Sequence, residues 1–254
     1  MLRWLFCGLL LTAPFAAPAQ ALEGGSTVSR SDATARATVV VQAVQPRTHG
    51  TAAVSDCTGT LIAPDLVLTA GHCVDIADGP DRVAVFFFDG AGVQPRYHHV
   101  VAVARHPRHV RDWAATPGTP AARQAEIGAD LAVLRLMTPV GRAPVALAGG
   151  GSPVRLYGAG RDGPDGQSAR LKYAPLMDGY ATSTGPSLMF ASAADAQICT
   201  GDSGGPVVTA DGRLWGVTGA IVRGRGGCAK RAVLVPVHPN GPGFLAMMRL
   251  ARGR

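Results

Sequence analysis

The sequence predicts an all-β protein made of two antiparallel barrels and a C-terminal α-helix. Hydrophobic residues make up 47% of the 254 residues, which is enough to fill a packed core. The 33 glycines and 19 prolines suit a chain with many turns better than a helical bundle. Short β-branched runs recur without the helix and strand alternation that a doubly wound parallel sheet requires.

The β-branched runs fall into two series, one for each predicted barrel. The first series covers residues 38–44, 60–69, 83–88, 100–104 and 131–136. The second series covers residues 154–157, 171–175, 188–191, 206–209, 214–222 and 232–237. A stretch rich in Pro and Gly, residues 138–152, is the expected linker, so we predict barrels at 22–140 and 141–254. Residues 244–252 carry apolar side chains on one side of a predicted helix.

The first 21 residues have the pattern of a secretory signal peptide. Arg3 precedes an apolar run, and small residues follow that end at Ala21. A membrane anchor is the alternative, but the uninterrupted run is shorter than the roughly 20 residues that span a bilayer. We therefore expect cleavage after Ala21, a secreted or periplasmic location, and no membrane contact once the leader is removed.

Four cysteines remain after removal of a leader that carries Cys7. An even number of cysteines in an oxidising compartment predicts disulfides. Three pairings are possible, and proximity in sequence favours Cys57 with Cys73 and Cys199 with Cys228. A zinc site is the alternative, but no Cys-x-x-Cys pair is present, so we expect no metal.

The net charge of +7 could attract an acidic partner. The arginines are scattered, however, and few aromatic residues lie between them for base stacking. We therefore expect no nucleic acid partner and no cofactor, and a monomer whose partner is a protein or peptide substrate.

The strongest chemical motif is Gly-Asp-Ser-Gly-Gly-Pro at residues 201–206, directly before a predicted strand. A serine hydroxyl needs a base to take its proton, and acyl transfer also needs N–H donors for the oxyanion. Glycines around Ser203 allow the tight backbone turn that presents both. The alternative is a glycine-rich turn with no chemistry.

A histidine in a second motif, Thr-Ala-Gly-His-Cys at residues 69–73, is the candidate base. The imidazole of His72 titrates near neutral pH, as a general base should. A structural histidine is the alternative, since six others are present. Four of those others are close together but fit no standard metal-ligand spacing, and we expect them in exposed loops. They are His98, His99, His106 and His109.

These motifs, in this order, resemble those of the trypsin and chymotrypsin family over nearly the whole mature chain. Residues 129–136 resemble the family's aspartate segment, in which the acid, here Asp130, precedes a buried strand. His106 with Pro107 and the turn at residues 158–160 give weaker correspondences. The resemblance implies two six-stranded antiparallel Greek-key β-barrels of the chymotrypsin-like type.

The resemblance also implies a serine endopeptidase. Ser203 would be the nucleophile, His72 the general base and Asp130 the orienting carboxylate. The N–H groups of Gly201 and Ser203 would form the oxyanion hole. Residues 22–25, Leu-Glu-Gly-Gly, resemble the start of mature family members, so a freed α-amino group of Leu22 would pair with Asp202.

The sequence departs from the trypsin-like pattern around the specificity pocket, which the Cys199 to Cys228 disulfide would bracket. Gln197 stands where trypsin-like members carry an aspartate, Ile221 would lie at the pocket mouth, and Ala232 would narrow it. We predict a preference for small or medium uncharged residues before the scissile bond.

Two further expectations concern function and an insertion. An inactive binding protein built on the same fold is the competing function. The insertion at residues 111–124 is expected to be a surface loop without chemistry of its own.

Overall fold

The computed structural model describes residues 22–111, 118–160, 170–183, 187–222 and 227–253. The predicted leader, residues 1–21, lies outside the described residues.

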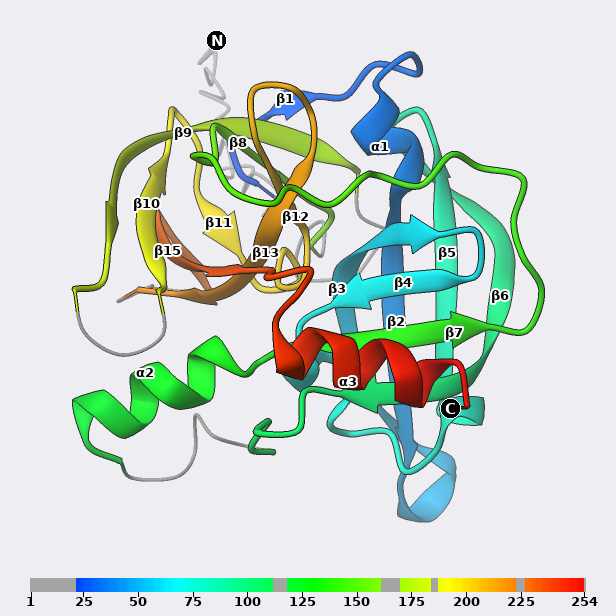
Figure 1. The fold of residues 1–254 in the computed structure, drawn as a ribbon. Coiled ribbons are helices and arrows are strands. Elements are labelled where there is room, and N and C mark those ends of the chain that lie inside the picture. Colours follow the sequence, from blue (N-terminus) through cyan, green and yellow to red (C-terminus); the bar gives the residue numbers. More distant parts are fainter. Residues whose placement is uncertain (1–21, 112–117, 161–169, 184–186, 223–226, 254) are drawn as a thin grey trace, which may run out of the picture.

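The first barrel is a closed ring of six antiparallel strands in the order β2-β3-β4-β7-β6-β5 (Figure 1). Its strands are β2 (Thr38–Pro46), β3 (Ala52–Ala63), β4 (Leu66–Thr69), β5 (Val83–Asp89), β6 (Gly92–Arg105) and β7 (Ala132–Leu136). The predicted run at 60–69 contains two strands, because Pro64 and Asp65 form the turn between β3 and β4. Valines and leucines on the inward faces fill the barrel.

The second barrel contains six strands in the order β9-β10-β15-β13-β12-β8, and β8 pairs back to β9 to close the ring. Its strands are β8 (Arg155–Gly158), β9 (Lys172–Ala181), β10 (Met189–Ala193), β12 (Pro206–Val208), β13 (Leu214–Ile221) and β15 (Arg231–Pro236). A short strand, β1 (Ser26–Thr27), extends the edge at β9. A separate ribbon pairs β11 (Ile198–Cys199) with β14 (Cys228–Ala229). The predicted fold class is confirmed.

Short helices connect the strands. They are α1 (Ala33–Ala37), η1 (Thr48–Gly50), η2 (Gly71–Val74), η3 (Pro80–Arg82) and α2 (Pro120–Gly128). The expectation of a loop is wrong at α2, because the Thr119 side chain caps the Ala122 N–H and Pro120 occupies the first helical turn. Residues 112–117 of that insertion lie outside the described residues. None of the helices described here has both the length and the apolar character of a membrane span.

Each end of the described chain packs on the barrel that is distant in sequence. Leu22 is fully buried among the apolar residues of the second barrel, and β1 pairs with β9 there. The C-terminal helix α3 (Pro242–Ala251) packs against β6 and β7 of the first barrel and buries Phe244 and Met247 in an apolar cluster made mainly of first-barrel residues. Figure 1 shows α3 (red) lying across β7. The strands thus divide between two barrels in chain order, while the ends cross over.

Candidate active site

Two of the motif residues meet where η2 follows β4 and where a turn leads into β7. The Asp130 carboxylate accepts two hydrogen bonds from His72, one from the backbone N–H to Oδ1 at 2.7 Å and one from Nδ1 to Oδ2 at 2.6 Å. Asp130 is fully buried, and the His72 side chain is 32% exposed. Since a carboxylate only accepts, Nδ1 carries the proton and Nε2 is left with its lone pair.

The same contact changes the basicity of His72. Burial disfavours the charged imidazolium, but the charge and hydrogen bond of Asp130, with the charge of Asp75, outweigh burial, so the pKa of His72 is raised above 6.5. A base with a raised pKa accepts a proton more readily at neutral pH.

A backbone hydrogen bond to the first barrel holds Ser203 beside the segment that carries His72. It lies in the loop between β11 and β12, and its carbonyl accepts the Thr58 N–H of β3 at 2.9 Å, a bond that joins the two barrels. The next residue, Gly204, has φ +78°, and a Cβ there would lie 2.2 Å from Thr69 Oγ1. Glycine at 204 therefore lets the serine loop close against the strand that leads to His72.

The loop also holds the two predicted oxyanion donors. Gly201 has φ +98°, and its carbonyl accepts the Thr58 hydroxyl at 2.8 Å. In the part of the chain that the structure describes, the N–H groups of Gly201 and Ser203 have no hydrogen-bond acceptor. Within the same residues no hydrogen bond joins Ser203 Oγ to His72 Nε2, a contact that often tightens only when substrate binds.

Asp202, the residue before the serine, is fully buried and accepts three backbone N–H groups. These come from Leu22 at 3.2 Å, Cys199 at 2.7 Å and Gly160 at 3.0 Å. Burial raises the pKa of Asp202 to about 6, although these bonds and the charge of Lys172 act in the opposite direction. The structure thus brings Leu22 and Asp202 together as the predicted pair of groups.

The four cysteines form the two disulfides that sequence proximity favoured, Cys57 to Cys73 and Cys199 to Cys228. The first links β3 to η2 directly beside His72. The second links β11 to β14 directly before the serine loop. Their sulfur atoms are therefore not zinc thiolates, although Cys57 and Cys73 lie close to His72.

The three predicted specificity residues occupy different surroundings. Ile221 and Ala232 are partners across β13 and β15, with Ala232 fully buried and Ile221 half-buried. Gln197 binds Glu23, whose carboxylate accepts its side-chain amide at 3.0 Å. Gln197 and Glu23 also line a cavity of about 590 Å³ with Lys230. The sequence did not predict this partner for Gln197.

Two residues close to Asp130, His109 and Asp75, were not identified from the sequence. His109 was expected in an exposed loop, but its side chain is only 2% exposed, because it packs against the Gly71 backbone and Asp130. Its Nε2 lies 2.9 Å from Oδ1 of Asp75, the residue that follows η2. No motif marks this pair, since the contact joins segments 34 residues apart.

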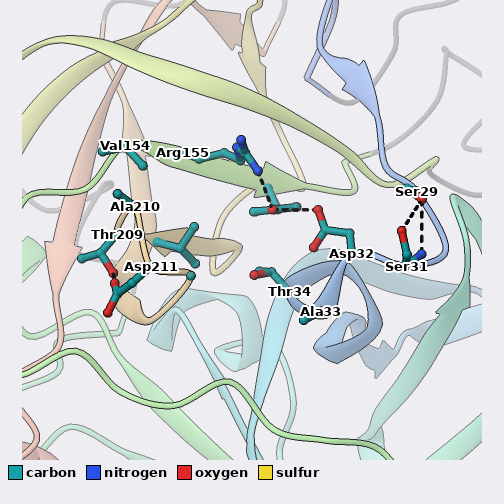
Figure 2. Close-up of a pocket in the computed structure, with 13 residues that line it drawn as sticks. Ser29, Ser31, Asp32, Ala33, Thr34, Val154, Arg155, Thr209, Ala210 and Asp211 are labelled. Carbon is teal, nitrogen blue, oxygen red and sulfur yellow. Dashed lines mark hydrogen bonds between the residues drawn. The ribbon is translucent and has the colours of Figure 1, made fainter.

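A second cavity, of about 450 Å³, lies between α1 and the turn after β12 (Figure 2). Asp32 caps the Ala35 N–H with one carboxylate oxygen and accepts the Tyr157 hydroxyl with the other. Across the cavity Asp211 accepts the Thr209 hydroxyl. Both carboxylates therefore bind neighbouring protein groups.

A family model described as Trypsin matches residues 27–240. The chain belongs to the trypsin family. Membership in this family, with the two disulfides, is compatible with an extracellular or periplasmic protein of the serine protease type.

Solved structures share the fold at low sequence identity. The active form of the Rv3671c protease from M. tuberculosis superposes with a TM-score of 0.56 at 18% identity, covering 91% of this chain and 88% of that chain. HL collagenase superposes with a TM-score of 0.64 at 18% identity, covering 91% of this chain and 99% of that chain. The scabies mite inactivated protease paralogue S-D1 superposes with a TM-score of 0.62 at 17% identity, covering 91% of this chain and 97% of that chain. The fold therefore occurs both in proteases and in an inactivated paralogue.

The buried Asp202 carboxyl gives a test of pH-dependent stability. With residues 1–21 attached, Leu22 offers it an uncharged amide. Because burial raises the pKa of Asp202 to about 6 in the folded chain, above the ordinary 3.8 of an unfolded chain, the folded chain holds this proton more tightly. The free energy of unfolding should therefore fall between about pH 4 and pH 6, by about 3 kcal/mol at about 1.4 kcal/mol per pKa unit.

Denaturant unfolding of Asp202→Asn across pH 4 to 7 checks this expectation. The variant should lose that part of the pH dependence. Asp195→Asn, at an exposed position, is the matched control for removing one carboxylate. An Asp202→Asn curve parallel to that of the unchanged protein would contradict the assignment.

Proposed function

We propose that this chain is a serine endopeptidase, exported to the periplasm or the medium after removal of residues 1–21. The observation that carries the proposal is the double hydrogen bond from His72 to the buried carboxylate of Asp130. That contact fixes the tautomer in which Nε2 accepts a proton, as a general base for Ser203 must.

The chemistry follows from these groups. Ser203 Oγ attacks the carbonyl carbon of the scissile bond while its proton passes to His72 Nε2, and Asp130 stabilises the imidazolium. The N–H groups of Gly201 and Ser203 bind the oxyanion, which is typically worth ~10²–10³ in rate per donor. His72 then gives its proton to the leaving amine, and water attacks the acyl-enzyme in the reverse sequence.

Labelling with a fluorophosphonate tests the triad. Protein that begins at Leu22 should be labelled at Ser203, and both Ser203→Ala and His72→Ala should abolish labelling, because the first removes the nucleophile and the second its base. Mass spectrometry of the labelled peptide is the measurement. Thr200→Ala, a hydroxyl lost from the same loop, is the matched control and should be labelled. Folded protein that is not labelled would contradict the proposal.

The second candidate function is a binding protein that has lost catalysis. The departure at Ile221, which would lie at the pocket mouth in the resemblance, favours it, and the same fold is found in an inactivated paralogue. This candidate predicts no labelling, so the same measurement separates the two functions.

The specificity proposal rests on the lack of an acid at position 197 and on Ile221. Gln197 carries no charge of its own, and its side-chain amide already binds the Glu23 carboxylate at 3.0 Å, so substrate Arg and Lys should be poor. Profiling with a peptide library should find the highest kcat/KM for small or medium uncharged residues before the scissile bond. A highest kcat/KM for cleavage after Arg or Lys would contradict this proposal.

Activation is proposed to occur when cleavage after Ala21 turns the Leu22 amide into an α-ammonium group. Leu22 N already lies 3.2 Å from Asp202 Oδ2, so cleavage adds a charge to a contact that exists, and the ion pair would keep Asp202 ionised. Protein starting at Leu22 should react with the fluorophosphonate severalfold faster than protein carrying one extra serine before Leu22. Equal rates, or active protein with a different first residue, would rule out this activation.

A further inference from the structure

A second histidine with a buried side chain, His109, lies beside the Asp130 carboxylate, near the oxygen that accepts the His72 backbone N–H. His109 follows β6, and its backbone N–H binds the carbonyl of His106 at 2.8 Å. Its Nε2 lies 2.9 and 3.1 Å from the two carboxylate oxygens of Asp75. Its Nδ1 lies 3.5 Å from Asp130 Oδ1, and among the residues that the structure describes that buried nitrogen has no hydrogen-bond partner.

The glycine before His72 makes this approach possible. A Cβ at Gly71 would lie 2.5 Å from His109 Nδ1 and 3.0 Å from Asp130 Oδ1. No side chain larger than hydrogen fits there without displacing one of these two groups. The backbone that carries His72 is therefore packed directly against His109.

The two ring nitrogens of His109 lie near different carboxylates, Nε2 at hydrogen-bond distance from Asp75 and Nδ1 at ion-pair distance, 3.5 Å, from Asp130 Oδ1. An ionised carboxylate only accepts hydrogen bonds, so both nitrogens need a proton to interact favourably. A neutral ring would turn one lone pair toward Asp75 or Asp130 in a buried place. The imidazolium form is the one that satisfies both contacts.

The surrounding charges keep Asp75 ionised. Arg105 Nε lies 3.2 Å from Asp75 Oδ1, and the Arg111 guanidinium donates to the Asp75 backbone carbonyl. Burial works against ionisation, but hydrogen bonding and charge from His109, with Arg105 and Arg111, hold the pKa of Asp75 below 3.8. His106 is the other titratable neighbour, and burial and the charges of Arg108 and His109 lower its pKa.

We propose that His109 is a positioning residue of the active site, which as an imidazolium held by Asp75 fixes the Asp130 carboxylate so that Oδ2 faces His72. This inference rests on the proposed protease function. The positive charge of His109 beside Asp130 also weakens the electrostatic stabilisation of imidazolium at His72. His109 therefore lowers the pKa of His72, and with it the pH at which His72 becomes a free base.

The protonation state of His109 can be read without any turnover. Nitrogen-15 spectra of the histidine rings in folded protein at pH 7 should show both His109 nitrogens protonated. An unprotonated Nδ1 at His109 would overturn the inference, whether or not the protein is active.

Two substitutions separate the contacts of His109. His109→Asn keeps a donor near the Nδ1 position, facing Asp130, and His109→Gln keeps one near Nε2, facing Asp75. His109→Gln should lower kcat by roughly tenfold or more with little change in KM, since Asp130 loses its support. His109→Asn should retain most of kcat. Both variants lose the cation, so in both the acid limb of kcat/KM should move to higher pH.

The outcomes distinguish this inference from the proposed function. Failure of the unchanged protein to react with the fluorophosphonate would remove the proposed function. Labelling of the unchanged protein, with wild-type kcat and pH profile in His109→Gln, would remove only the role of His109. If either variant fails to fold by circular dichroism, the ring-nitrogen spectrum of the unchanged protein decides.

Discussion

A fully buried carboxylate, Asp130, is the group on which the arrangement of the candidate site depends. A buried charge is costly unless donors surround it. His72 supplies two donors from one residue, which fixes both the start of η2 and the imidazole. The solvation of one anion thus orients a side chain that is itself partly open to solvent.

The second constraint is the seam between the barrels. Thr58 contributes its N–H to Ser203 and its hydroxyl to Gly201, and it accepts the Ala159 N–H at 3.0 Å. One threonine of the first barrel therefore binds three points of the second. β3 also contains Cys57, whose disulfide to Cys73 holds η2. The serine loop and His72 are therefore both attached to β3.

Much of this architecture could be predicted from the sequence, because the interactions that define it are local. The β-branched runs gave most strands, and the cysteine spacing gave both pairings. The motif around His72 and the residues flanking Asp130 identified two groups that the structure brings into contact. Prediction failed where the contact is tertiary. Burial of His109 depends on Asp75 and on the space at Gly71. Helix α2 was missed for a different reason, because its local cap at Thr119 lies within a segment rich in loop-forming residues.

The crossing of the chain ends has a mechanical consequence. Residues 22–27 strap the second barrel, while α3 straps the first, with Phe244 and Met247 buried in an apolar cluster made mainly of first-barrel residues. Separation of the barrels as rigid bodies would have to detach both of these terminal segments as well as break the contacts between the barrels. Opening of the interface between the barrels therefore requires local unfolding of the terminal segments, so the two barrels should unfold as a single cooperative unit.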